Sequence, residues 1–261
     1  MTLHGPPTKR GYGHVRDGVD ERDRHVGQLL GAVTPGVPLP RAIDRSVYLD
    51  DVQDQGPTSS CVGQAIASAA FLVAAIAGAP IVRPSALAIY ALARELDAPK
   101  EDLVDLGCAP RSALKACSNF GLCAAARWPF DAAKVDEPLP WDVLQHAADG
   151  RLTGYYRSDT GDVALQIRTA IARGHVPIFG MPVDASYEQW DGSGVYQGVT
   201  GEVLGYHAQA IIGYDGPDFL VLNSWGRSWG ADGIARIDGA FVAGSLCFDR
   251  WVLTVSPPEV T

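Results

Sequence analysis

The chain has little positive charge, and this shortage narrows the class of protein. Its 261 residues include 21 Lys and Arg against 30 Asp and Glu, for a net charge of -9 at pH 7, and only four of the basic residues are lysines. The basic residues are dispersed, so no patch is predicted that would attract phosphate backbones or an anionic membrane. Neither nucleic acid nor a membrane is therefore an expected partner.

Long hydrophobic runs are also missing. The most apolar stretch, residues 61–82, is rich in alanine and is broken by Gly78 and Pro80. This length is near the lower limit for crossing a bilayer, so a buried core helix is the better interpretation. The basic pair at residues 9–10 is not followed by the apolar run that a secretory signal needs. We expect a cytoplasmic protein, with non-classical export or packaging in an assembly left open.

The five cysteines (residues 61, 108, 117, 123 and 247) form no CxxC pair and no Cys/His set with zinc-ligand spacing. No metal ion or organic cofactor is therefore predicted. The odd number leaves at least one thiol free in a monomer. Without a secretory signal, buried reduced thiols are the default, although a disulfide from Cys108 to Cys117 or Cys123 stays open.

The composition and the predicted secondary structure of the chain change along its length. Residues 1–38, rich in Gly, Pro, Arg and Asp, indicate an extended N-terminal arm or short pro-segment before a domain of residues 39–261. Capped helical patterns occupy about 55–150, and short β-type runs between Gly and Asp occupy about 151–255. The expected fold is α+β, with a helical first lobe, an antiparallel second lobe and a cleft between them.

A turn-rich loop, Gln55-Gly-Pro-Thr-Ser-Ser-Cys61, leads directly into the apolar helix. This order places Cys61 at the helix N-terminus, where free backbone N–H groups and the helix dipole favour a thiolate over a thiol. A lone cysteine is more often a small buried residue, so Cys61 needs partners to count as a nucleophile.

Those partners are predicted by a second cluster. His207 opens one predicted strand and Asn223 closes the next, so a hairpin places the two side chains side by side. An amide beside the imidazole orients the ring without adding a third charge to a thiolate–imidazolium pair. The other histidines have no such partner.

Taken together, these residues resemble the papain family of cysteine peptidases. The signals are Gln55 six residues before Cys61, His207 about 130 to 150 residues further on, and Asn-Ser-Trp-Gly-x-x-Trp-Gly-x-x-Gly at 223–233. The resemblance spans roughly residues 39–255 and is closer to bacterial and viral members. It implies a two-lobe papain-like fold and a cysteine endopeptidase or exopeptidase that acts on peptide or protein substrates.

The resemblance also implies roles for individual residues. Cys61 is the expected nucleophile, His207 its general base, Asn223 the orienting amide and Gln55 an oxyanion donor. Trp225 is expected to cover the bond between His207 and Asn223 and to adjoin the substrate. One further residue, Gly107, is a candidate for binding the substrate backbone.

Several features depart from the family pattern. Ser59-Ser60-Cys61-Val62 replaces Gly-Ser-Cys-Trp, and residues 1–38 lack the long helical pattern of the family's inhibitory prodomain. We therefore expect the arm to pack on the body or cross the cleft, with autoinhibition as the hypothesis. Three other functions stay open: a silent peptide-binding module, a structural part of a larger assembly, and a cysteine-dependent deamidase or transglutaminase.

Overall fold

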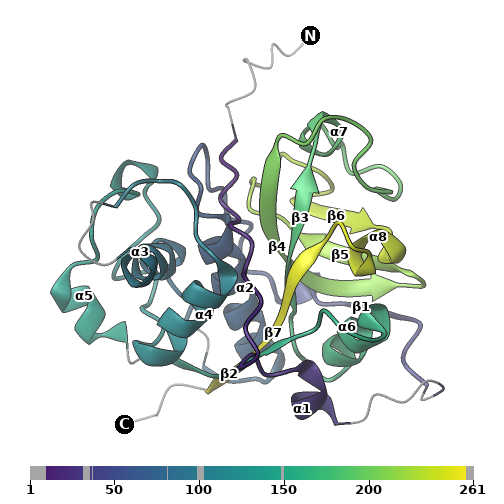
Figure 1. Cartoon of the computed structure of the whole chain (residues 1–261), viewed down its shortest axis with the longest axis horizontal. Coiled ribbons are helices and arrows are strands. Elements are labelled where there is room, and N and C mark those ends of the chain that lie inside the picture. Colours follow the sequence, from purple (N-terminus) through teal and green to yellow (C-terminus); the bar gives the residue numbers. More distant parts are fainter. Residues whose placement is uncertain are drawn as a thin grey trace.

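The helical and the β-type regions of the sequence form two lobes in the computed structural model, with helices on one side and a sheet on the other (Figure 1). The structure describes residues 10–31, 36, 38–80, 82–98, 103–147 and 150–256. The predicted α+β architecture, with an antiparallel second lobe, is confirmed.

The helices of the described residues are α1 (Val26–Leu30), α2 (Cys61–Ile76), α3 (Ala86–Asp97), α4 (Pro110–Asn119), α5 (Trp141–Gln145), α6 (Val163–Ala172), α7 (Ala185–Glu188) and α8 (Gly239–Ala243). Short 3-10 turns lie at Ser46–Tyr48 and Ala132–Lys134. The strands are β1 (Ala42–Asp44), β2 (Arg151–Arg157), β3 (Ile178–Val183), β4 (Gly205–Asp215), β5 (Asp218–Leu222), β6 (Ile234–Ile237) and β7 (Phe248–Ser256).

Local residues set the starts of three of the long helices. Ser85 caps α3 by accepting a hydrogen bond from the Ala88 amide, and the Asp162 carboxylate caps α6 through the Leu165 amide. Pro110 takes the first turn of α4, where its missing N–H is not needed. The α2 helix is buried along most of its length and packs against α3 and β4, so it forms the floor shared by both lobes.

The sheet has seven antiparallel strands in the order β2-β7-β3-β4-β5-β6, with β1 also paired to β4. Central β3 and β4 are almost wholly buried, and a second hydrophobic core fills the sheet lobe around Tyr187, Trp225 and Trp229. The β4–β5 hairpin brings the end of β5 beside the beginning of β4, which positions the candidate site.

Sequence patterns missed the short elements. β1 and the helices of five residues or fewer were not predicted, and one of these helices, α1, lies within the segment expected to be extended. Such elements are too short to show a period and depend on tertiary packing. In the described part of the chain no helix is long and apolar enough to cross a membrane. All five cysteines are buried free thiols, so neither disulfide left open is present.

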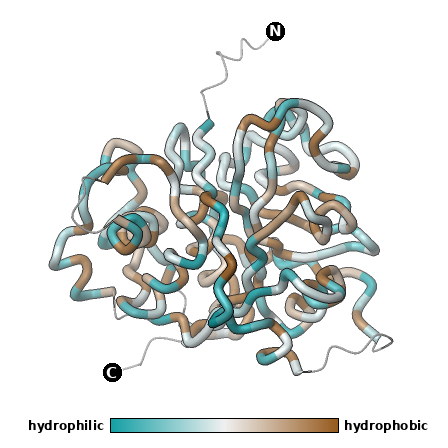
Figure 2. Tube along the Cα trace, viewed as in Figure 1, coloured by the Kyte–Doolittle hydropathy of each residue, from teal (hydrophilic) through white to brown (hydrophobic). Residues whose placement is uncertain are grey.

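Between the lobes lies the N-terminal arm. Its described part runs from Arg10 down between the helices and the sheet and reaches α1 beneath them (Figure 1). The backbone contacts both sides, because the Cys108 amide donates to Gly13 O at 3.0 Å and the His14 amide donates to Tyr206 O at 3.2 Å. Figure 2 shows that much of this course is hydrophilic. The arm therefore occupies the place where the sequence predicts a cleft.

Candidate active site

Cys61 is the first residue of α2 and is fully buried. The preceding loop turns sharply at Gly56, whose φ of 57° lies in the left-handed region, and is tied by a hydrogen bond from Thr58 Oγ1 to Gln55 O at 2.9 Å. Burial raises the pKa of the Cys61 thiol to about 11, although hydrogen bonds from the Ala208 and Gly13 backbones lower it. With the arm in place, the sulfur is therefore a thiol.

The strand pair places His207 beside Asn223 as predicted. His207 Nε2 lies 2.7 Å from Asn223 Oδ1, which also accepts the Ser224 amide at 2.7 Å. Because this oxygen receives a backbone N–H, it acts as the acceptor, and Nε2 must carry the hydrogen. Nδ1 then holds the lone pair and has no hydrogen-bond partner among the described residues.

Trp225 covers this pair. Its ring stacks on the His207 imidazole with centroids 4.6 Å apart and an interplanar angle of 27°, and it is fully buried. The position fits the expected cover for the His207–Asn223 bond. Tyr12 of the arm contacts the same ring at an edge, 6.5 Å between centroids, so the arm lies next to Trp225 in this state.

The His207 imidazole is held neutral. Burial lowers its pKa to about 4; the bond to Asn223 opposes this, and the nearby His14 and Arg10 add to the lowering. The Cys61 sulfur lies close to this strand, because the backbone of Ala208, the residue after His207, bonds to it. Burial keeps both the thiol and the imidazole uncharged. The catalytic pair of the family requires proton transfer between the two groups, which burial of both disfavours.

Gln55 links the loop to the second lobe and to the arm. Its Oε1 accepts from Ser224 Oγ at 2.6 Å, and its Nε2 donates to Thr58 O at 2.6 Å and to Gly11 O at 3.2 Å. The amide that the resemblance assigns to an oxyanion is thus directed partly at an arm carbonyl. Ser224 was not predicted, although it lies within the Asn-Ser-Trp-Gly run.

Two arm glycines allow this approach. A Cβ on Gly11 would lie 2.1 Å from Thr58 O, and a Cβ on Gly13 would lie 1.6 Å from Ser59 O. Opposite them, a Cβ on Gly107 would lie 2.2 Å from Gly13 O. The candidate backbone-binding residue Gly107 therefore faces a peptide chain, and that chain is the arm. The pattern Gly-Tyr-Gly was visible in the sequence, but nothing local showed which surface it would meet.

The structure thus joins His207 to Asn223 beneath Trp225 and places the Cys61 sulfur against the backbone of Ala208. Gln55 is directed toward Ser224 and the arm, and Gly107 lies across the arm. Among the residues that the structure describes, no three His, Cys, Asp or Glu side chains are grouped to hold a metal ion. The chemistry available to this arrangement is nucleophilic attack by sulfur with an imidazole as proton carrier.

Comparisons with known proteins agree with the geometry. The model of the papain family of cysteine proteases matches residues 39–242. An uncharacterized peptidase C1-like protein, L477 of Acanthamoeba polyphaga mimivirus, is 29% identical over 94% of this chain and 86% of its own length. Cathepsin B-like CP3 of Giardia intestinalis is 50% identical, but over only 17% of each chain.

Solved structures show the same fold. The cysteine protease xylellain of Xylella fastidiosa superposes with a TM-score of 0.79 and 24% identity, covering 97% of this chain and 99% of its own. The bromelain protease of Ananas comosus superposes with a TM-score of 0.65 and 21% identity, covering 83% of this chain and 99% of its own.

Proposed function

The chain belongs to the papain family of cysteine proteases, and we propose that it is an active peptidase whose nucleophile is the Cys61 sulfur. One observation carries this proposal: the His207–Asn223 hydrogen bond lies beneath Trp225, while the backbone of the next residue, Ala208, bonds to the sulfur at the start of α2. A silent binding module would have no need to retain all of these side chains.

The reaction follows from the same contacts. His207 Nδ1 takes the thiol proton, and the Cys61 thiolate attacks the peptide carbonyl to form a C–S bond. The oxyanion is then held by Gln55 Nε2 and the Cys61 backbone N–H. The imidazolium gives its proton to the departing amine as the C–N bond breaks. Water, deprotonated by His207, hydrolyses the thioester and restores the thiol.

The arm is proposed to inhibit this reaction. It places Gly11 O on Gln55 Nε2 and the Gly13 backbone on the Cys61 sulfur, so a peptide carbonyl has no route to either group. It also buries both the thiol and the imidazole, which keeps each in its uncharged form. Inhibition in this proposal is therefore both steric and electrostatic.

The test uses the full chain and a Gly13→Ala variant, called here the opened variant, because an alanine methyl cannot fit against the Ser59 carbonyl. Fluorogenic peptide amides should be hydrolysed faster by the opened variant than by the unaltered chain. Cys61→Ala in the opened variant should abolish turnover, and Asn223→Ala should remove only part of it.

An epoxysuccinyl peptide should label the opened variant once, and mass mapping should place the label on Cys61. Label on Cys108, or turnover that survives Cys61→Ala, would reject the mechanism. Equal hydrolysis by the unaltered chain and the opened variant would reject inhibition by the arm and leave the mechanism standing.

A further inference from the structure

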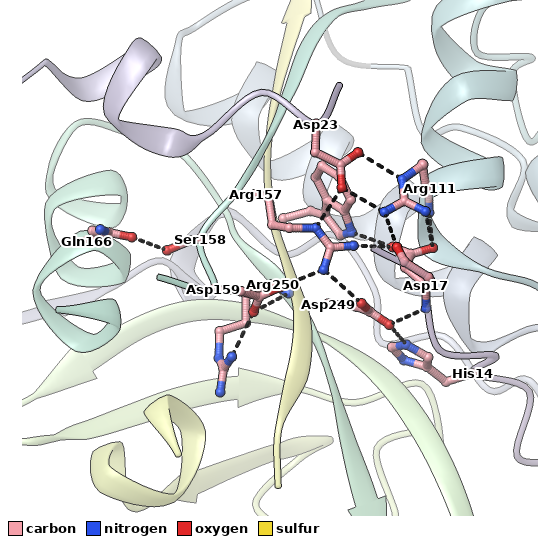
Figure 3. A network of polar contacts seen from close by, with 12 residues as sticks. His14, Asp17, Asp23, Arg111, Arg157, Ser158, Asp159, Gln166, Asp249 and Arg250 are labelled. Atoms are coloured by element: carbon pink, nitrogen blue, oxygen red, sulfur yellow. Dashed lines mark hydrogen bonds and ion pairs between the residues drawn. The ribbon is translucent and has the colours of Figure 1, made fainter. Parts of the chain in front are cut away.

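The arm inserts one side chain into a pocket next to the catalytic cysteine. The His14 side chain has 0% exposure, and its Nε2 lies 2.9 Å from Asp249 Oδ2 (Figure 3). Its neighbour Gly13 contacts the Cys61 sulfur through its backbone. The pocket therefore lies one residue away from the reacting sulfur along a bound chain.

The walls of this pocket are fitted to an imidazole. On β3, a Cβ at Gly180 would lie 1.9 Å from His14 Cε1, and its three nearest atoms all belong to the His14 ring. Phe248 meets the ring edge-on, with centroids 5.0 Å apart and an interplanar angle of 81°. A side chain at position 180 would therefore occupy the space that the His14 imidazole fills.

The pocket ends at the carboxylate of Asp249, a residue with an unusual backbone conformation. Asp249 is buried and has a φ of 52°, in the left-handed region that non-glycine residues seldom adopt. Such residues persist where the surroundings hold them, often at ligand-binding positions. Burial raises the pKa of the Asp249 carboxyl, but hydrogen bonds from His14 and the Asp17 amide, with the charge of Arg157, bring it below its usual range.

Both donors to Asp249 Oδ2 belong to the arm. They are His14 Nε2 at 2.9 Å and the Asp17 amide at 2.8 Å, whereas Oδ1 accepts from Arg157 at 3.2 Å (Figure 3). When the arm leaves, Oδ2 loses both partners while Arg157 keeps the carboxylate charged. A buried acceptor without a donor is costly, so an incoming N–H group is favoured there.

We propose that this His14 pocket selects the peptide substrate, and that it accepts a histidine side chain within two residues of the bond that Cys61 attacks. The inference rests on the proposed peptidase activity and on departure of the arm. An imidazole has the length and the N–H donor that Asp249 requires.

Lysine, arginine and acidic side chains fit the His14 pocket less well than histidine does. Arg111 and Arg157 lose their arm partners Asp17 and Asp23 when the arm leaves, so the surroundings become more positive. A second full cation from lysine or arginine gains less there than an imidazole that titrates near neutrality. An acidic side chain is repelled by Asp249 itself, and an aliphatic one leaves Oδ2 without a donor.

The experiment compares internally quenched fluorogenic peptides that carry His, Arg, Lys, Leu or Glu in turn at each of the two positions on either side of the cleaved bond. In the opened variant, kcat/KM for the best His peptide should exceed that for its Leu counterpart by about 10- to 100-fold, the range expected for a hydrogen bond to a charged group. The Glu peptide should be the poorest.

Two further substitutions in the opened variant test the pocket itself. Gly180→Ala, whose methyl occupies the imidazole position, and Asp249→Asn should each reduce the His preference. The matched control is Asp159→Asn, which lies in the same network but pairs with Arg157 and Arg250 instead of His14. It should keep the preference.

A binding measurement distinguishes failure of this inference from failure of the proposed peptidase activity. The same peptides are titrated calorimetrically into the opened variant carrying Cys61→Ala. If the His peptide binds more tightly than the Leu peptide, and the opened variant with Cys61 intact shows no turnover, the pocket is supported and the peptidase proposal is rejected. Equal binding of the His and Leu peptides, no binding of either, or a preference unchanged by both Gly180→Ala and Asp249→Asn would overturn the pocket.

Discussion

Replacing Gly13 with alanine should expose the Cys61 thiol to small alkylating reagents. The backbone of Gly13 has no left-handed φ, so alanine is conformationally acceptable there. The obstacle is contact, because the new Cβ would lie 1.6 Å from the Ser59 carbonyl oxygen, and real Cβ atoms do not approach within 3.0 Å. Ser59 belongs to the loop that starts α2, so the arm is the part that must move.

The size of the effect follows from the thiol pKa. Burial raises it to about 11 from an ordinary value of 9.0. If solvent access restores the ordinary value, the thiolate fraction at pH 7 increases about 100-fold, since each pKa unit is a factor of ten. The helix N-terminus acts in the same direction. We therefore expect Cys61 alkylation to accelerate by at least about 100-fold.

The assay is iodoacetamide labelling at pH 7, followed over time by peptide mass mapping. The other four thiols serve as internal references because all are buried, and burial raises the pKa values of Cys108, Cys117 and Cys247 as well. The matched control is Gly18→Ala, since a Cβ at Gly18 meets nothing within 4 Å. Labelling of Cys61 at equal rates in Gly13→Ala, Gly18→Ala and the unaltered chain would refute the reasoning.

Three further outcomes are expected. Gln55→Ala in the opened variant should lower kcat/KM by about 100- to 1000-fold, the loss typical of one oxyanion donor; an unchanged value, with the fold verified by circular dichroism, would remove Gln55 from the mechanism. In the unaltered chain the His207 imidazole should stay neutral down to about pH 4, because burial lowers its pKa, and its NMR titration midpoint should rise in the opened variant; a midpoint near 6.5 in the unaltered chain would contradict this. Asp17→Ala should reduce the free energy of unfolding by roughly 1–3 kcal/mol, because it removes one of the carboxylates paired with Arg157 and leaves the buried Trp251 Nε1–H without an acceptor. Urea denaturation measures the loss, and Asp20→Ala, which removes a pair to the exposed Arg22, should change the free energy by less than about 1 kcal/mol.

The sequence was most informative where a residue type has few structural uses. The order Gln55, Cys61, His207, Asn223 requires a helix start and a hairpin, and both are present as predicted. The starts of α3 and α6 are set locally, because Ser85 and Asp162 cap them. Short elements such as β1 and α1 escaped, because each is fixed by its partner and not by its own few residues.

The contacts of the arm, by contrast, could not be predicted from the sequence. Its Gly-Tyr-Gly pattern and charged residues are readable from the sequence, but their partners lie far away in the chain, on the Ser59 loop, at Gly180 and at Asp249. No local rule pairs residues so distant, because packing of the two lobes creates the space that they share.

The sequence by itself therefore determined the fold class and the family, since the residue types and their order leave few other arrangements. Only the tertiary structure decided which segment covers the site. It places a peptide carbonyl on Gln55, removes water from Cys61 and His207, and fills the pocket at Asp249 with an imidazole. The physical reason is burial, because charge, pKa and access at this site depend on which segment covers it.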